Sequence, residues 1–214
     1  MNNNGTLLHN HITIMTQNNF LRHGLISFMR DIHASDIHTD VKKIVFIDVC
    51  SLKFISDLGV ILNNAYINGC SVILVCSGGE MSMVLGRLPH INAAQSLSSW
   101  EMKIRTLLCP NLIPYYLKEF NELLFLKKLG VIRLLIIFMI SKGISFNGIA
   151  QTLSLPDKTL YRYIGGLVSY FNMKNSSFLF FFLKTRFPPS YFDSWLPEEY
   201  TEKKLTPNNN AAVH

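Results

Sequence analysis

The chain has 214 residues, of which 49% are hydrophobic, and a formal net charge of +6. This length and apolar content suit one large or two small packed domains. The first residues, Met-Asn-Asn-Asn-Gly, lack the basic and apolar regions of a secretory signal. The four cysteines have no paired metal-ligand spacing, and the histidines fit no compact ligand set. We therefore expect a cytoplasmic protein with reduced thiols and no metal site.

The first half of the chain alternates strand-like and helix-like segments. Apolar runs predict strands and helical spacing predicts helices, in the order strand 12–16, helix 20–32, strand 43–49, helix 58–68, strand 71–76 and helix 98–108. Strands that are apolar along their whole length are typical of a parallel sheet with both faces covered. The sequence thus predicts an α/β domain over residues 1–110.

Two prolines in residues 109–114 mark a break, so we expect a linker over residues 111–120. The strongly apolar run at 123–140 is interrupted by three basic residues. Its uninterrupted part, 134–140, is too short to cross a bilayer. We therefore expect a helix buried in a core or in a subunit contact, and no membrane role.

Residues 143–175 predict two short helices with a tight turn between them. The first helix, at 147–154, has Ile149, Ala150 and Leu153 on one side. The second, at 157–171, has an apolar stripe formed by Leu160, Ile164, Leu167 and Phe171. This spacing turns outward Lys158, Arg162, Gly165, Gly166 and Ser169. Because a helical glycine costs about 1 kcal/mol relative to alanine, we expect this outer face to approach another surface closely.

At these residues the chain resembles the LuxR/FixJ-type (NarL-like) DNA-binding domain of bacterial transcription regulators. The matching residues are Gly143, Ser145, Ile149, Ala150, Leu153, Lys158, Thr159, Leu160, Ile164, Phe171 and Asn175. Pro156 and Tyr163 depart from the family pattern, and residues 130–133 replace its polar segment before the motif. The resemblance implies an all-α helix-turn-helix domain over residues 121–186 that binds double-stranded DNA.

The resemblance also implies roles for individual residues, with the second helix lying in the major groove. Lys158 and Arg162 would contact phosphate and guanine, Thr159 a phosphate or a base methyl, and Tyr161 the edge of the groove. Backbone phosphates would be bound by Lys142, Ser145 and Lys174. The fourth helix of the family, often a dimer contact, corresponds to residues 178–183 and gives the dimer-contact residues Phe178, Phe181 and Phe182.

The distribution of charge favours the same interpretation. Residues 121–186 contain nine basic and two acidic side chains, a net charge of +7. Residues 1–110 have a net charge of +1, and those after Arg186 one of −2. A localised cationic surface attracts phosphate. The alternative is a surface for a membrane or for an acidic protein.

The first domain resembles the receiver domain of two-component response regulators, a flavodoxin-like parallel sheet. Residues 20–25, Phe-Leu-Arg-His-Gly-Leu, are similar to the first helix of NarL-type receivers. Asp48 falls at the phosphoacceptor position. Receivers also hold Mg²⁺ with an acidic pair, but Thr16 and Gln17 stand there. We therefore expect a degenerate receiver that is not switched by aspartyl phosphate, in which Asp48 caps a neighbouring loop.

The chain is similar to enterobacterial regulators of fimbriae, curli and capsule that combine a degenerate receiver with a LuxR-type domain. This similarity implies a sequence-specific transcriptional regulator without enzymatic activity or cofactor, acting as a homodimer or with a related regulator. Two alternatives stay open: an interaction protein that has lost DNA binding and heterodimerises with or sequesters a related regulator, and a regulator that responds to a cyclic dinucleotide. No motif supports a small-molecule ligand. Residues 187–214 are expected to form an aromatic segment and a flexible tail.

Overall fold

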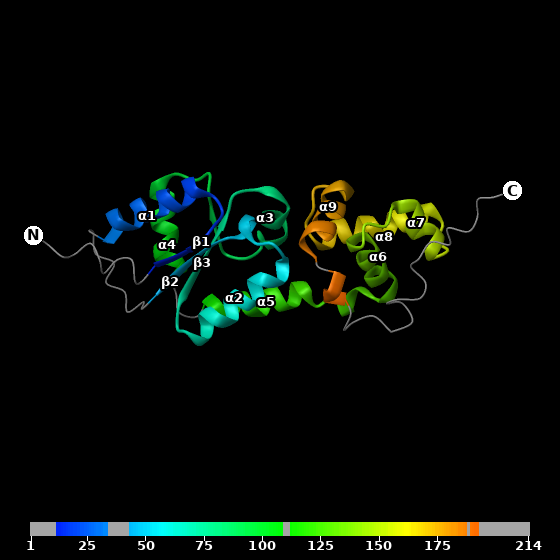
Figure 1. Ribbon diagram of the computed structural model, residues 1–214, viewed down its shortest axis with the longest axis horizontal. Coiled ribbons are helices and arrows are strands. Elements are labelled where there is room, and N and C mark those ends of the chain that lie inside the picture. Colours follow the sequence, from blue (N-terminus) through cyan, green and yellow to red (C-terminus); the bar gives the residue numbers. More distant parts are fainter. Residues whose placement is uncertain (1–11, 34–42, 109–111, 188, 193–214) are drawn as a thin grey trace, which may run out of the picture. The chain divides into compact units, whose positions relative to one another are not determined.

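The computed structural model describes residues 12–33, 43–108, 112–187 and 189–192 (Figure 1). The chain divides into two compact units, Met1–Leu124 and Phe125–His214. A parallel sheet with helices forms the first unit, and helices form the second (Figure 1). The structure thus confirms the predicted fold class, an α/β unit followed by an all-α unit.

Four parallel strands form the sheet of the first unit, in the spatial order β1-β2-β3-β4. The strands are β1 (Ile12–Met15), β2 (Ile44–Asp48), β3 (Ser71–Cys76) and β4 (Ile91–Asn92). Residues 34–42, between β1 and β2, lie outside the described residues. The described sheet is receiver-like in that all of its strands are parallel.

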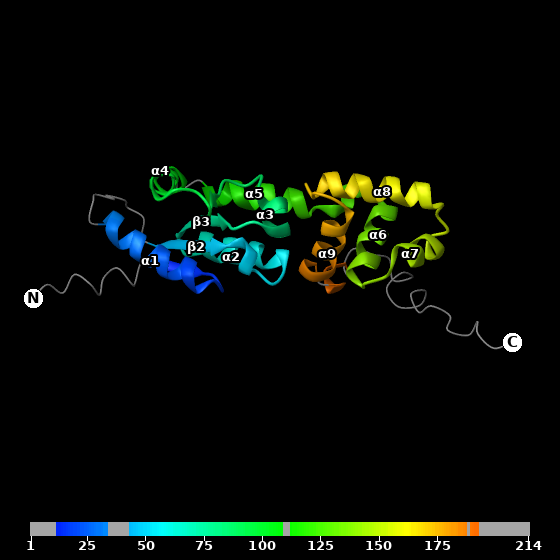
Figure 2. The same cartoon turned by 90° about the horizontal axis from the view of Figure 1, so that it is seen from above.

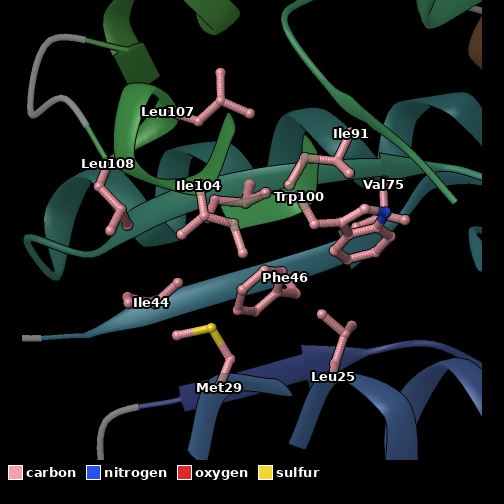
Figure 3. Packing of buried hydrophobic residues seen from close by; sticks show 11 residues of the cluster. Leu25, Met29, Ile44, Phe46, Val75, Ile91, Trp100, Ile104, Leu107 and Leu108 are labelled. Atoms are coloured by element: carbon pink, nitrogen blue, oxygen red, sulfur yellow. The ribbon is translucent and has the colours of Figure 1, made fainter. Parts of the chain in front are cut away.

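Helices cover both faces of this sheet, as the uniformly apolar strands predict. On one face, α1 (Asn19–His33) and α4 (Leu97–Leu107) pack against β2 and β3. Figure 3 shows Met29 of α1 and Trp100 of α4 beside Phe46 of β2. The opposite face carries α2 (Ile55–Ile67) and α5 (Leu112–Leu124), which contact β3 and each other (Figure 1). The short α3 (Gly79–Leu85) follows β3.

Helix α5 belongs to the core of the first unit. Its buried residues are Ile113, Tyr116, Phe120, Leu123 and Leu124. The hydroxyl of Tyr116 donates to the carbonyl of Pro89 at 2.7 Å. A Cβ atom at Gly59 of α2 would lie 2.8 Å from the Phe120 ring, so the ring needs glycine there. We expected a linker over residues 111–120. In the structure, the residues from 112 onward form most of the packed helix α5 instead.

The second unit contains four main helices among the described residues. They are α6 (Val131–Ser141), α7 (Phe146–Thr152), α8 (Asp157–Tyr170) and α9 (Ser176–Arg186), preceded by the 3-10 turn η4 (Leu126–Leu129) and followed by η5 (Pro189–Phe192). Figure 2 shows α8 along one side of the unit. Residues 134–141 of α6 are all buried, as predicted for the apolar run. None of the helices in the described part of the chain is both long and apolar enough to span a membrane.

Aromatic rings form the centre of this second core. The Phe171 ring lies 5.6 Å from Phe182 and 6.0 Å from Phe187, measured between ring centroids. Phe192 lies 5.8 Å from both Phe187 and Phe138. These rings join α8, α9, α6 and η5, so Phe187 and Phe192, which follow α9, pack on the helices. The rest of the expected tail, from residue 193, lies outside the described residues.

Candidate nucleic-acid interface

Helices α7 and α8 are joined by a tight turn, as predicted. Ser145 caps α7, its hydroxyl accepting from the Gly148 amide at 3.3 Å. Ser154 adopts a left-handed conformation, with φ of 51°, just after the helix ends. Pro156 precedes α8 without a side-chain cap. Its φ of −59° suits the start of a helix, so this departure from the family pattern is compatible with the turn.

Helix α8 has one buried and one exposed face. Leu160, Ile164 and Leu167 are at most 3% exposed, and the following Phe171 is fully buried. The opposite face exposes Lys158, Tyr161, Arg162, Gly165, Gly166 and Ser169, while Thr159 is half-buried. The predicted apolar stripe and outward cations are both present. The helix therefore offers cationic side chains on a surface anchored by its apolar side.

The two adjacent glycines of α8 are not required by packing within the unit. A Cβ atom at Gly165 would meet no atom of the described residues within 4 Å. At Gly166 it would lie 3.8 Å from Arg133 Nε, an ordinary van der Waals distance. Each glycine lowers helix stability relative to alanine by about 1 kcal/mol, and packing among the described residues does not account for this cost.

Further cations flank the two helices. Lys142, Lys174 and Lys184 are exposed. The Lys142 ammonium lies 5.4 Å from the Phe138 ring centroid at the end of α6. A Cβ atom at Gly143 would lie 3.7 Å from Lys184 Cε, so α9 brings Lys184 to the turn between α6 and α7. Sequence reasoning placed Lys142 and Lys174 at the interface but assigned no role to Lys184.

Two arginine side chains make cation–π contacts with the Tyr163 ring. The Arg133 guanidinium lies 5.5 Å from its ring centroid and that of Arg162 lies 5.9 Å away. Arg133 also donates to the carbonyl of Leu129 at 3.2 Å. These contacts tie α6 to α8 where the chain departs from the family pattern. Sequence reasoning did not find them because the pairing of Arg133 with Tyr163 depends on how the helices pack.

Phe146 and Tyr161 form an aromatic pair that the sequence did not indicate. Their ring centroids are 4.4 Å apart and the planes make an angle of 35°. Phe146 begins α7 and is half-buried, whereas Tyr161 is 65% exposed on α8. The pair places an aromatic surface beside the cations of α8.

The three phenylalanines expected at a dimer contact differ in exposure. Phe182 is fully buried and packs against Phe171 and Phe187. This corrects the expectation that Phe182 forms a dimer contact, because its ring is part of the unit's own core. Phe178 is half-buried and Phe181 is 55% exposed. Of the three, Phe181 offers the largest exposed fraction to a partner.

In the first unit, Asp48 lies at the carboxyl end of β2 and is 4% exposed. One carboxylate oxygen accepts from the hydroxyls of Thr16 at 2.8 Å and Ser51 at 2.7 Å. The other accepts from the Cys50 amide at 3.1 Å, which caps the 3-10 turn η3 (Val49–Ser51). Among the described residues, no group of three or more His, Cys, Asp or Glu side chains could hold a metal ion. Asp48 thus has the loop-capping geometry expected for it.

Because of Cys76, at the end of β3, the stability of the first unit should fall with rising pH in the alkaline range. Burial raises the pKa of this thiol from 9.0 to about 11. A raised pKa in the folded state means that stability is complete below pH 9.0 and is lost as the pH rises toward about 11. We expect a loss of about 2–3 kcal/mol over this interval. Urea unfolding followed by tryptophan fluorescence at each pH would measure it.

The matched control for this prediction is Cys70→Ala, at a half-buried thiol in the same unit. We expect Cys76→Ala to flatten the pH dependence between pH 9.0 and 10, and Cys70→Ala to leave it unchanged. Burial also raises the pKa of Tyr116. The loss of stability due to Tyr116 should begin about one pH unit above that due to Cys76. The same slope in wild type and Cys76→Ala would contradict the assignment.

No protein-family model matches the chain, and the search of curated proteins found no match. Among solved structures, the chain is similar to response regulator StyR. The sequence identity is 13%, the likeness covers 81% of this chain and 98% of that chain, and the TM-score is 0.33. The parallel sheet and the helical second unit are assigned from the strands and helices of this chain, independently of this likeness.

Proposed function

We propose that the chain is a DNA-binding transcriptional regulator and that α8 lies in the major groove. The observation that carries this proposal is the outer face of α8, where Lys158 and Arg162 are exposed beside Gly165. The buried stripe on the other side fixes the direction of these cations. Recognition helices of helix-turn-helix proteins present their outer face to base edges in this way.

The proposed phosphate contacts come from the same unit. Lys142, Ser145 and Lys174 are exposed, and we assign them to the DNA backbone. We assign Thr159 of α8 to the backbone as well. Residues 121–186 carry the net charge of +7. A positive field of this kind attracts duplex DNA and makes the affinity fall steeply with salt.

We infer that the first unit acts without aspartyl phosphorylation. The Asp48 carboxylate already accepts three hydrogen bonds from Thr16, Cys50 and Ser51. Phosphorylation would replace an acceptor oxygen in a site that is 4% exposed. The position where receivers use a carboxylate to bind Mg²⁺ holds the Thr16 hydroxyl, which is a donor to Asp48.

The two alternative functions gain less support from the structure. An interaction protein could offer the apolar α6 to a partner, but residues 134–141 are buried within their own unit. A cyclic dinucleotide needs cationic groups for its phosphates. A cavity of about 190 Å³ between α1 and α4 is lined by apolar side chains and Gln95. Neither observation favours its alternative, the interaction protein or the dinucleotide-responsive regulator, over DNA binding.

Salt-titrated binding to a random-sequence DNA duplex tests the proposal. If Lys142, Lys158, Arg162 and Lys174 each neutralise one phosphate, the logarithm of the affinity should fall against that of the salt concentration with a slope of about −3.6 per protomer. Fluorescence anisotropy of a labelled duplex measures it. Absence of binding at protein concentrations up to about 10⁻⁴ M would favour the interaction protein, since non-specific DNA binders usually bind more tightly.

A further inference from the structure

We propose that Tyr161, backed by Phe146, forms an apolar contact for the 5-methyl group of thymine in the bound DNA. This inference rests on the proposed DNA-binding function and names the base that this part of the surface recognises. The cations of α8 would supply affinity for phosphate and guanine, and the aromatic pair would supply the preference for thymine.

The orientation of the Tyr161 ring is set within the protein. It packs on Phe146 with centroids 4.4 Å apart and an angle of 35° between the rings. Phe146 itself is half-buried at the start of α7. Of the Tyr161 residue surface, 65% is exposed. The ring therefore meets DNA already positioned, which reduces the entropy lost on binding.

No side chain projects from α8 at the position one turn after this ring, because residue 165 is glycine. Gly165 lies one helical turn after Tyr161, on the same face of α8. A Cβ atom at Gly165 would meet no described atom within 4 Å. A base edge can therefore approach the helix backbone here while touching the side of the Tyr161 ring. This arrangement also explains why a helix with an otherwise regular pattern has glycine at this position.

Thymine is the base whose chemistry suits such a contact. In the major groove, its C5-methyl group is the apolar feature that distinguishes it from the other bases, which present hydrogen-bond donors and acceptors. The faces of the Tyr161 and Phe146 rings carry no hydrogen-bonding group for those polar edges, so a contact with the rings favours the methyl group. On α8, Lys158 and Arg162 can serve the polar edges instead, so the two kinds of contact divide along the helix.

The test removes the methyl group alone. Full-length protein first selects duplexes from a random-sequence library, and each thymine of an enriched duplex is then replaced by uracil, one at a time. We expect at least one replacement to weaken binding about three- to fivefold, the effect of losing one buried methyl group. Tyr161→Ala should bind the thymine and uracil duplexes equally, and Tyr161→Phe should keep the preference.

Two further variants separate a local role from a general one. Phe146→Leu keeps an apolar side chain but removes the supporting ring, and should reduce the preference for thymine. Tyr66→Ala removes an exposed tyrosine from α2 in the first unit and should leave the preference intact. Equal binding of every uracil duplex by wild-type protein would overturn the thymine contact while DNA binding stood. Failure to enrich any duplex would overturn the proposed function and this inference together.

Discussion

Replacing Lys158 and Arg162 together with alanine is expected to weaken binding to random-sequence duplex DNA by about 10- to 100-fold at physiological salt. The slope of log affinity against log salt should become shallower by about 1.8, because two fewer phosphates are neutralised. Both side chains are exposed, so the change should leave the fold intact. Fluorescence anisotropy measures the affinity, and circular dichroism checks the helices.

The matched control removes the same charge from the first unit. Arg30 and Lys118 are exposed on α1 and α5, and Arg30→Ala with Lys118→Ala lowers the net charge by the same two units. We expect the affinity of this control to stay within about twofold of wild type, because short-range phosphate contacts outweigh distant charges at physiological salt. If both double variants lost affinity equally, net charge rather than the face of α8 would govern binding.

Replacing Phe182 with alanine should lower the free energy of unfolding of the second unit by about 3–5 kcal/mol. The ring is fully buried and its centroid lies 5.6 Å from Phe171 and 5.5 Å from Phe187. Its removal leaves a cavity at the point where α8, α9 and the segment after α9 meet. Such a loss is a large part of the stability of a small domain. Urea unfolding followed by circular dichroism would measure it.

The neighbouring residue provides the control. Phe181 lies on the same helix but is 55% exposed, so Phe181→Ala should change the free energy of unfolding by no more than about 0.5 kcal/mol. The two substitutions delete the same atoms one position apart. A similar loss in both would mean that the buried and exposed faces of α9 are assigned incorrectly.

The parts of the fold that could be predicted have a local cause. Leu160, Ile164 and Leu167 repeat at helical spacing, so their burial in α8 and the exposure of Lys158 and Arg162 follow from the period of the helix. The buried strands were predicted in the same way, because an apolar run in an alternating α/β order has few other arrangements. These features need no knowledge of distant residues.

The linker was predicted from prolines, and the structure shows why this signal misled. Pro114 is the third residue of α5, and proline is tolerated in the first turn of a helix because no backbone acceptor awaits its missing N–H. The apolar spacing of Tyr116, Phe120 and Leu123 continues the helix beyond it. Composition around a proline therefore indicated a break where a helix begins.

The remaining features join residues that are distant in sequence. Asp48 receives hydrogen bonds from Thr16, which precedes it by 32 positions. Phe146 meets Tyr161 only because the turn after α7 folds the two helices together. No periodic pattern encodes such pairs. The sequence indicated which residue types are present, but not which of them touch.

The end of α5 determines how this chain can be cut into separate expression fragments. A fragment that stops at residue 110 would lack Tyr116 and Phe120 of α5. The apolar surface of α2 and β3 that α5 covers would then be exposed and prone to aggregation. One extending through Leu124 keeps that surface covered. The second unit begins at Phe125, directly before η4, so a fragment of the helical unit can start at this residue.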